Sequence, residues 1–396
     1  MTAKLKPYPK YKDSGVEWLG EVPEGWAIQK LKYSLKIKNG QDYKDLQTNE
    51  GGYPVIGSGG EFARASHYIY DGVSILFGRK GTIDKPLLID CKFWTVDTMF
   101  YSIIELNRNP KFLFYRSIII NFDFYSTSTA LPSMTQEDLN NITIGLPSFQ
   151  EQTTIANYLD KQTEKIDKLI ENYQKLIALS KEKRTALITH CVTKGLDPNV
   201  KMKDSGIEWL GEVPEEWKCL KVKHYGSYKS GDFIQSEDIK INGKYPVIGG
   251  NGLRGYSNSY NLCGVYPIIG RQGALCGNIN YSEEKSWITE HGIIVRNHKN
   301  ITNTQWLGYM LFTMNLNQYS MSSAQPGLAV ENIINLVSIL PSLHEQTIIA
   351  NYLDKQTAKI DQTIDKAKQA IELLKEKRTA LITAAVTGKI DVRECV

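Results

Sequence analysis

The sequence contains few residues suited to metal binding or disulfide formation. Its 396 residues include six cysteines and six histidines, no two cysteines form a CxxC pair, and the histidines are scattered. A structural zinc site needs closely spaced ligands and a disulfide framework needs paired cysteines, so neither is expected. We interpret the cysteines as reduced side chains that fill small apolar spaces or lie on the surface.

Long apolar runs are also missing. No stretch is long enough to cross a bilayer, and the chain does not begin with the basic and then apolar pattern of a secretion signal. We therefore expect a cytoplasmic protein without a membrane partner. The formal net charge is only +4, so a nucleic-acid partner would require basic residues gathered on particular surfaces.

Motifs typical of catalysis are absent from the sequence. It contains no GxSxG, HExxH or Walker motif, and its glycine-rich turns at 56–60 and 248–255 are not followed by the lysine of a phosphate-binding loop. It also lacks the glycine-rich cofactor loop and the Asp/Asn-Pro-Pro-aromatic tetrapeptide that an adenine methyltransferase would carry. We predict a recognition or scaffold protein with no catalytic residue, no metal and no cofactor of its own.

The chain consists of two copies of one sequence unit. The segment KDSGVEWLGEVPEGW at 12–26 returns as KDSGIEWLGEVPEEW at 203–217, and LPSFQEQTTIANYLDKQTEKID at 146–167 returns as LPSLHEQTIIANYLDKQTAKID at 340–361. Each unit is too long for a solenoid repeat. Between these matches the copies share only short landmarks. This pattern indicates a constant frame that carries two related domains with different surfaces.

The last third of each copy predicts a long helix. A capping-box pattern opens each helix and a glycine is expected to end it, with Ser148, Glu151 and Gly195 in the first copy and Ser342, Glu345 and Gly388 in the second. Core-compatible residues follow the heptad period of a coiled-coil seam, at Ile155, Leu159, Gln162, Ile166, Leu169, Tyr173 and Leu176, and at Ile349, Leu353, Gln356, Ile360, Thr363, Ala367, Ala370 and Leu374. We expect the two helices to pack on each other in antiparallel orientation; alternatively, each helix packs only on its own domain.

The less similar segments, 27–145 and 218–339, are rich in glycine and in short apolar runs such as YPVIG and GVYPIIG. They predict mixed α/β domains with a curled sheet of short strands and some helix near 109–122 and 303–316. Two tryptophans flank a GEVPE turn in each opening segment. We interpret these four residues as anchors that fix each domain to the helices, with base stacking as the alternative: Trp18, Trp26, Trp209 and Trp217.

An arginine recurs in a glycine-flanked turn of each domain, GRKG at 78–81 and GRQG at 270–273. Such a turn lets the backbone approach a nucleic acid while the arginine reaches a phosphate or a guanine edge. The alternative is an ordinary turn with an exposed arginine. Glycine-rich turns and small polar loops add further candidates, which would otherwise be solvent-exposed turns. The candidate DNA-binding residues are Gly78, Arg79, Lys80, Ser58 and Ser128 in the first domain and Arg271, Gln272, Asn251, Arg254 and Ser323 in the second.

Together these residues resemble a known family. Two tandem units with a WLGEVPEGW type opening, a divergent body with a GRxG landmark, and the helical motif LPSxxEQxxIANYLDKQTxKID closely resemble the specificity (S) subunit of type I restriction-modification systems, the HsdS family. The resemblance covers essentially the whole chain. It implies two globular target recognition domains separated by two long conserved helices that form an antiparallel coiled coil, with pseudo-two-fold symmetry between the copies.

The resemblance also implies a domain organisation. Residues 1–147 would be the first target recognition domain and 148–197 the first spacer helix. Residues 198–341 would be the second target recognition domain, and 342–396 the second spacer helix with a C-terminal tail.

The mechanism implied by the resemblance assigns recognition to this chain and chemistry to its partners. Each target recognition domain would recognise one half of a bipartite asymmetric site in double-stranded DNA, and the coiled coil would set the gap. Two methylation subunits would dock on the conserved parts and methylate adenines with S-adenosylmethionine. Restriction subunits would add ATP- and Mg-dependent translocation and cleavage.

Two other functions are compatible with the residues. The chain could be a coiled-coil adaptor that presents two protein-binding heads, which the modest net charge favours. It could also recognise DNA for a different modifying partner. Salt-sensitive, sequence-selective binding to duplex DNA would separate the adaptor from both recognition functions.

Overall fold

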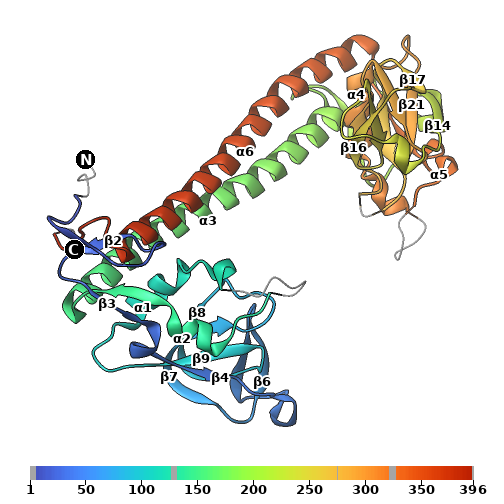
Figure 1. The fold of residues 1–396 in the computed structure, drawn as a ribbon. Helices are drawn as coiled ribbons and strands as arrows, with labels where there is room; N and C mark the ends of the chain where they lie inside the picture. Colours follow the sequence, from blue (N-terminus) through green and yellow to red (C-terminus); the bar gives the residue numbers. More distant parts are fainter. Residues whose placement is uncertain (1–5, 126–131, 274, 321–326, 395–396) are drawn as a thin grey trace. The chain divides into compact units, whose positions relative to one another are not determined.

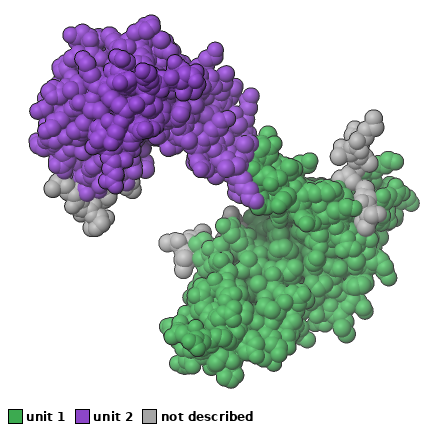
Figure 2. Space-filling view, turned by 180° about the vertical axis from the view of Figure 1, so that it is seen from behind, with its two compact units in different colours: residues 1–173, 369–396 green, residues 174–368 purple. Residues whose placement is uncertain are grey.

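The computed structural model describes residues 6–125, 132–273, 275–320 and 327–394. The chain forms two compact units, 1–173 with 369–396 and 174–368 (Figure 2). Each unit contains one body, the beginning of one long helix and the end of the other. Consequently both long helices contribute to both units.

The first unit contains a mixed α/β body. Its strands are β1 (Tyr11–Asp13), β2 (Glu21–Pro23), β3 (Ala27–Lys30), β4 (Leu35–Asn39), β5 (Tyr53–Gly57), β6 (Gly60–Ala65), β7 (Tyr70–Gly78), β8 (Leu87–Thr95), β9 (Met99–Ile104) and β10 (Thr143–Leu146). Its short helices are α1 (Pro110–Ile118) and α2 (Gln136–Asn141). A six-stranded sheet has the order β4-β9-β7-β8-β5-β6, in which β5 and β8 are parallel. β3 pairs with β10 beside this sheet.

The second unit repeats this body with small changes. Its strands are β11 (Met202–Asp204), β12 (Glu212–Pro214), β13 (Lys218–Lys221), β14 (Gly226–Ser230), β15 (Tyr245–Gly249), β16 (Gly252–Ser257), β17 (Leu262–Cys263), β18 (Pro267–Gly270), β19 (Ile279–Tyr281), β20 (Lys285–Ile288), β21 (Gly292–Asn297) and β22 (Val337–Leu340). Its short helices are α4 (Thr304–Thr313) and α5 (Val330–Ile334). Here the main sheet is divided into two, with the orders β14-β21-β18-β19 and β16-β15-β20-β17. The predicted mixed α/β class is confirmed in both bodies.

The two long helices are α3 (Phe149–Lys194) and α6 (Leu343–Val386) (Figure 1). Both begin directly after the predicted capping serine, and both end just before a glycine with positive φ, Gly195 at 81° and Gly388 at 75°. Only glycine adopts this left-handed conformation without strain, so it ends a helix well. The predicted helix limits are therefore confirmed.

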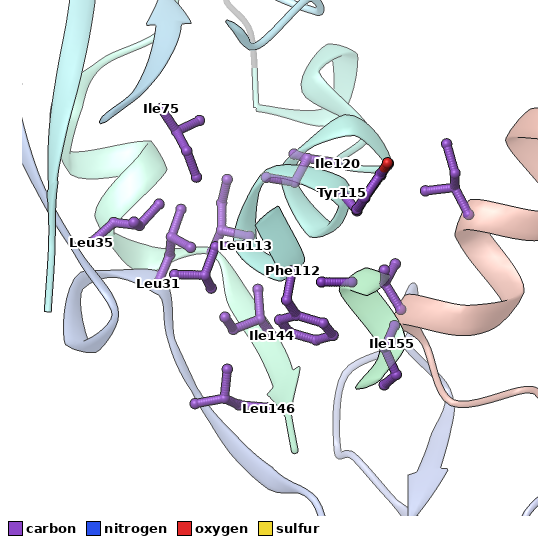
Figure 3. Packing of buried hydrophobic residues seen from close by; sticks show 14 of the residues in the cluster. Leu31, Leu35, Ile75, Phe112, Leu113, Tyr115, Ile120, Ile144, Leu146 and Ile155 are labelled. Atoms are coloured by element: carbon purple, nitrogen blue, oxygen red, sulfur yellow. The ribbon is translucent and has the colours of Figure 1, made fainter. Parts of the chain in front are cut away.

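Buried residues show how the helices run. In the first unit Ile155 at the beginning of α3 and Ile382 at the end of α6 belong to one buried cluster, together with Phe112 of α1. Figure 3 shows Phe112 lying among Ile144, Leu146 and Ile155. The corresponding cluster of the second unit joins the end of α3 to the beginning of α6 in the same way. Since a helix beginning meets a helix end in both units, α3 and α6 are antiparallel, as predicted.

The seam of the long helices differs by one residue from the predicted pattern at alternate positions. Leu169 and Leu176 are 45% and 40% exposed, whereas Ile170 and Ile177 beside them are partly buried. In α6 the predicted Thr363 is exposed, and Ile364 is buried instead. Because apolar residues stand next to each other in the sequence, two heptad patterns shifted by one residue both fit it. Packing against the partner helix buries the isoleucine of each adjacent pair.

Candidate nucleic-acid interface

The opening tryptophans attach each body to its long helix. Trp26 is buried and donates its indole N–H to the Glu151 carboxylate of α3 at 3.0 Å. Trp217 makes the same bond to Glu345 of α6 at 2.9 Å. The interpretation of these two tryptophans as anchors is thus confirmed, whereas Trp18 and Trp209 are 37% and 36% exposed.

The capping boxes form only in part. Ser148 Oγ accepts a hydrogen bond from the backbone N–H of Glu151 at 3.3 Å, and Ser342 Oγ accepts one from Glu345 at 3.2 Å, as predicted. The two carboxylates, however, accept the tryptophan N–H groups described above, and Glu151 also accepts the Tyr8 hydroxyl at 2.7 Å. In this frame the glutamate therefore connects a body to its helix.

A buried glutamine follows each of these glutamates. Gln152 accepts the backbone N–H of Asn109, the residue that caps α1, at 2.9 Å. Gln346 accepts the backbone N–H of Asn303, the cap of α4, also at 2.9 Å. A buried amide must satisfy its hydrogen-bonding groups, so each glutamine fixes the position of a short helix relative to a long one.

A tyrosine of each short helix completes the joint between body and long helix. Tyr115 of α1 donates to Asp160 at 2.8 Å and lies 3.0 Å from the Thr163 hydroxyl. Tyr309 of α4 makes the equivalent contacts with Asp354, at 2.7 Å, and Thr357, at 3.3 Å. Burial raises the pKa of each tyrosine to about 12, so both remain neutral donors at physiological pH.

Most polar residues of the repeated motif EQxxIANYLDKQTxKID therefore have a structural role. The glutamate, the glutamine, the first aspartate and the threonine hold a body. The second aspartate pairs with an arginine of the other helix, Asp167 with Arg378 at 2.9 Å and Asp361 with Arg184 at 3.1 Å. This frame places the variable turns of each body in a defined orientation on its helix.

The arginine turn of the first body begins at Gly78, where β7 ends. A Cβ atom there would lie 2.0 Å from the carbonyl oxygen of Thr82, so only glycine fits. The Arg79 backbone donates to Thr98 at 2.8 Å and accepts from Met134 at 3.0 Å, and its half-buried guanidinium donates to the Asp97 carbonyl at 3.3 Å. The exposed Lys80 follows, in a β-bridge with Ser133.

The second body holds its arginine turn in the same way. Arg271 donates its backbone N–H to His291 at 2.8 Å and accepts from Leu328 at 2.9 Å, and the exposed Gln272 forms a β-bridge with Gly327. The side chain of Arg271 donates to Ser230 at 3.3 Å. The repeated geometry shows that these turns are specific features of the body rather than irregular loops.

The structure brings some of the candidate residues together. A Cβ atom on Gly270 would lie 2.4 Å from the carbonyl oxygen of Gly250, so the turn that carries Asn251 lies against the arginine turn. Arg254 passes over Gly249 of the same hairpin, where a Cβ would lie 2.7 Å from its Cδ.

Other candidates are not brought together. Ser58 lies in the turn between β5 and β6, and among the described residues it forms no hydrogen bond with Arg79. Phe62 covers Gly57 at the place where Arg254 covers Gly249 in the second body. Ser128 and Ser323 lie outside the described residues. The roles of all ten candidate residues remain predictions.

Sequence reasoning missed one part of this surface. Asp97 and Thr98 lie beside the arginine turn of the first body, and Glu290 and His291 take the same place in the second. His291 Nε2 lies 3.3 Å from Glu290 Oε1. The signal in the sequence was the related pair of segments KFWTVDT at 92–98 and KSWITEH at 285–291, which differ at these residues.

The first body contains a buried positive charge. Arg116 of α1 is 1% exposed, and none of its three guanidinium nitrogens has a hydrogen-bond partner within the residues described. Its guanidinium lies 4.8 Å from the ring centroid of Trp18. Burial lowers its pKa to about 9, which still leaves it charged at neutral pH. At the corresponding position of α4 the second body has Met310.

Sites of other kinds were not found in the part of the chain that the structure describes. It contains no group of three or more His, Cys, Asp or Glu side chains placed to hold a metal ion. None of the helices within the described ranges is long and apolar enough to cross a bilayer.

A family model matches both copies. The model of the type I restriction modification DNA specificity domain matches residues 23–179 and again 214–373. Each match includes a body from β3 or β13 onward and most of one long helix.

Individual relatives give the same result. Residues of this chain are 47% identical over 111 residues to the type I restriction enzyme EcoprrI specificity subunit of Escherichia coli, an alignment that covers 28% of this chain and 27% of the relative. The MjaVIII specificity subunit of Methanocaldococcus jannaschii is 23% identical over 424 residues, with 94% of each chain covered.

Solved structures share the fold. A chain from a study of complex assembly and conformational transition of the type I R-M system has a TM-score of 0.71 at 16% identity, with 93% of this chain and 99% of that chain covered. The HsdS subunit from Thermoanaerobacter tengcongensis has a TM-score of 0.51 at 15% identity, with coverage of 93% and 98%.

Proposed function

Since the chain belongs to the family of type I restriction-modification DNA specificity domains, we propose that each of its bodies recognises one half of a bipartite asymmetric DNA site. The observation that carries this proposal is the pair of arginine turns. Their backbones are held identically, through Thr98 and Met134 in one body and His291 and Leu328 in the other. A constant scaffold with different side chains around it suits two recognition surfaces with different targets.

The side chains at the turns have the chemistry for base recognition. Arginine pairs with the O6 and N7 atoms of guanine, glutamine and asparagine pair with adenine, and glutamate accepts from the amino group of cytosine. The first body offers Arg79, Lys80 and Asp97 near its turn. The second offers Arg271 and Gln272 together with the neighbouring Asn251 turn. We expect these different sets to select different half-sites.

The long helices would set the gap between the half-sites. With 46 and 44 residues, the helices measure about 69 and 66 Å at 1.5 Å per residue. These lengths correspond to about two turns of B-DNA, at about 34 Å per turn. The tyrosine, glutamine and tryptophan contacts would keep each body at a fixed angle on its helix, so that the gap has one value.

The frame also suits binding of partner subunits. Because the joint is duplicated, two copies of one methylation subunit would find equivalent surfaces on a single chain. S-adenosylmethionine would be bound by these methylation subunits, and ATP and Mg by restriction subunits. This chain would supply recognition and no catalytic residue. The relatives named as specificity subunits of restriction enzymes support this division of roles.

Methylation in vivo tests the proposal. The chain is co-expressed with a type I methylation subunit, and methylated adenines are mapped across the genome with and without it. The proposal predicts a two-part asymmetric motif with a fixed gap that disappears when this chain is deleted. Unchanged methylation after deletion would contradict it and would favour a protein-binding adaptor.

A further inference from the structure

The first body also carries a partly exposed cluster of two tyrosines and a lysine. Tyr53 and Tyr68 form an edge-to-face pair, with ring centroids 5.0 Å apart at an angle of 72°. Lys92 of β8 lies over Tyr68, with its Nζ 4.9 Å from the ring centroid. A lysine held over an aromatic face is attracted to the ring, which restricts its position before any ligand arrives.

The second body contains the same cluster. Tyr245 and Tyr260 form an edge-to-face pair with centroids 4.9 Å apart at 67°, and Lys285 of β20 lies 5.1 Å from the Tyr260 ring. Tyr68 and Tyr260 are both 43% exposed. We call these two sites the tyrosine–lysine clusters.

Stability of the body does not account for this repetition. The two bodies differ at most exposed positions, for example where Phe62 of β6 corresponds to Arg254 of β16. Buried residues are shared because they fill the same core, but the exposed tyrosine and lysine of each cluster lie outside the buried clusters. An exposed group that both bodies keep fits a partner feature that both bodies meet.

One tyrosine and the lysine of each cluster lie on strands of the sheet, Tyr53 and Lys92 on β5 and β8 and Tyr245 and Lys285 on β15 and β20. Tyr245 begins β15, which ends at Gly249 beside the Asn251 turn, and Lys285 begins β20, which runs parallel to β15. Four residues of extended strand span about 13 Å. A duplex is wide enough for a turn to enter a groove while residues at this distance meet its backbone.

We propose that the tyrosine–lysine clusters contact the phosphate backbone of each half-site independently of its sequence. The inference rests on the proposed function, because phosphates are the feature that two different half-sites have in common. Lysine ammonium groups and tyrosine hydroxyls both donate to phosphate oxygens. Such contacts supply affinity and position the protein, while the turns supply sequence choice.

The two clusters differ in how far their charge is neutralised. In the first body Lys92 lies 3.6 Å from Asp71, and the neighbouring Arg64 lies 3.2 Å from Glu61. In the second, Lys285 and Lys244, which lies 5.3 Å from the Tyr245 ring, have no carboxylate within 4.0 Å among the described residues. The second cluster therefore contributes more to phosphate binding than the first.

The test measures the salt dependence of DNA binding by the complex of this chain with its methylation subunits. Two duplexes are compared, one with the mapped site and one with both half-sites scrambled, and dissociation constants are measured at several KCl concentrations. Each phosphate contact adds about 0.9 to the slope of log affinity against log salt. For Lys285→Gln we expect a slope shallower by about 0.9 on both duplexes, and for Lys92→Gln a smaller change. Lys299→Gln, an exposed lysine outside the cluster, is the control and leaves the slope unchanged.

Two results would overturn the inference. One is an unchanged slope for Lys285→Gln in a complex that stays intact. The other is loss of the methylation subunits from the Lys285→Gln complex on gel filtration, which would assign the cluster to a protein partner. If the wild-type complex does not distinguish the two duplexes, the proposed function fails instead, so the two failures are distinguishable.

Discussion

Arg378 of α6 and Asp167 of α3 form a bidentate ion pair, with Nε to Oδ1 at 2.9 Å and Nη2 to Oδ2 at 3.3 Å. The same two sequence positions form the ion pair between Arg184 and Asp361 in the second unit. Each pair joins the C-terminal half of one long helix to the N-terminal half of the other. The repeated pairs thus mark the antiparallel register within each unit.

Reversing one charge of this pair will destabilise the first unit. Asp167→Arg places two like charges together, and we expect the free energy of unfolding to fall by about 1 kcal/mol because the pair is partly exposed. Exchange of both charges, Asp167→Arg with Arg378→Asp, will restore most of the loss. Urea unfolding in a double-mutant cycle measures this coupling. If the stability loss of the doubly exchanged variant equals the sum of the losses of the two single variants, the two residues are not energetically coupled.

Replacement of the buried Arg116 by methionine will stabilise the first body. The guanidinium has no hydrogen-bond partner in the described residues, and Met310 shows that the same helix position accepts an apolar side chain. We expect a gain of about 1–3 kcal/mol in the free energy of unfolding, measured by urea denaturation. The matched variant Met310→Arg will lose at least about 3 kcal/mol. A lower stability of Arg116→Met would mean that the charge is stabilised by its surroundings.

The tyrosine hydroxyls that join the bodies to the helices contribute to stability. Tyr115→Phe removes the bonds to Asp160 and Thr163, and we expect a loss of about 1–2 kcal/mol, since a partly buried carboxylate loses its partner. Tyr309→Phe will show a similar loss. Tyr33→Phe, at an exposed tyrosine, is the control and should stay within about 0.5 kcal/mol of the wild type.

The same tyrosines predict a dependence on alkaline pH. Burial raises the pKa of Tyr115 from 10.0 to about 12, so the folded state keeps a proton that the unfolded state releases. Its stabilising contribution is complete below pH 10 and is lost as the pH rises toward 12. Urea unfolding at pH 9 and pH 11 should therefore show a smaller decrease for Tyr115→Phe than for the wild type. Equal decreases for the two proteins would contradict the raised pKa of Tyr115.

Features that depend on neighbouring residues in the chain were predictable from the sequence. The ends of α3 and α6 follow from local signals, because a serine satisfies the first free amide groups and a glycine accepts the left-handed conformation. The pairing of the two helices follows from the length of the apolar stripes, and its antiparallel direction from the order of bodies and helices along the chain. The repeated sequence segments indicated that one frame carries two different bodies. The match to the family model confirms the family resemblance that these segments suggested.

Features that depend on distant residues were not predictable. The carboxylate of Glu151 bonds to Trp26, which lies in a different sequence segment, so the local capping-box pattern described only half of its role. The helix seam could be placed only with the partner helix present. Asp97 and Glu290 lie beside the arginine turns because of strand pairing that no local motif indicates.

The most direct measurement is an exchange of one body. Residues 27–145 are replaced by the corresponding segment of a relative with a known different target, and methylated adenines are mapped in cells that also express the methylation subunit. The account predicts a motif in which one half changes, while the other half and the gap stay the same. A motif that keeps both halves, or changes in both, would contradict the claim that each body recognises its own half-site.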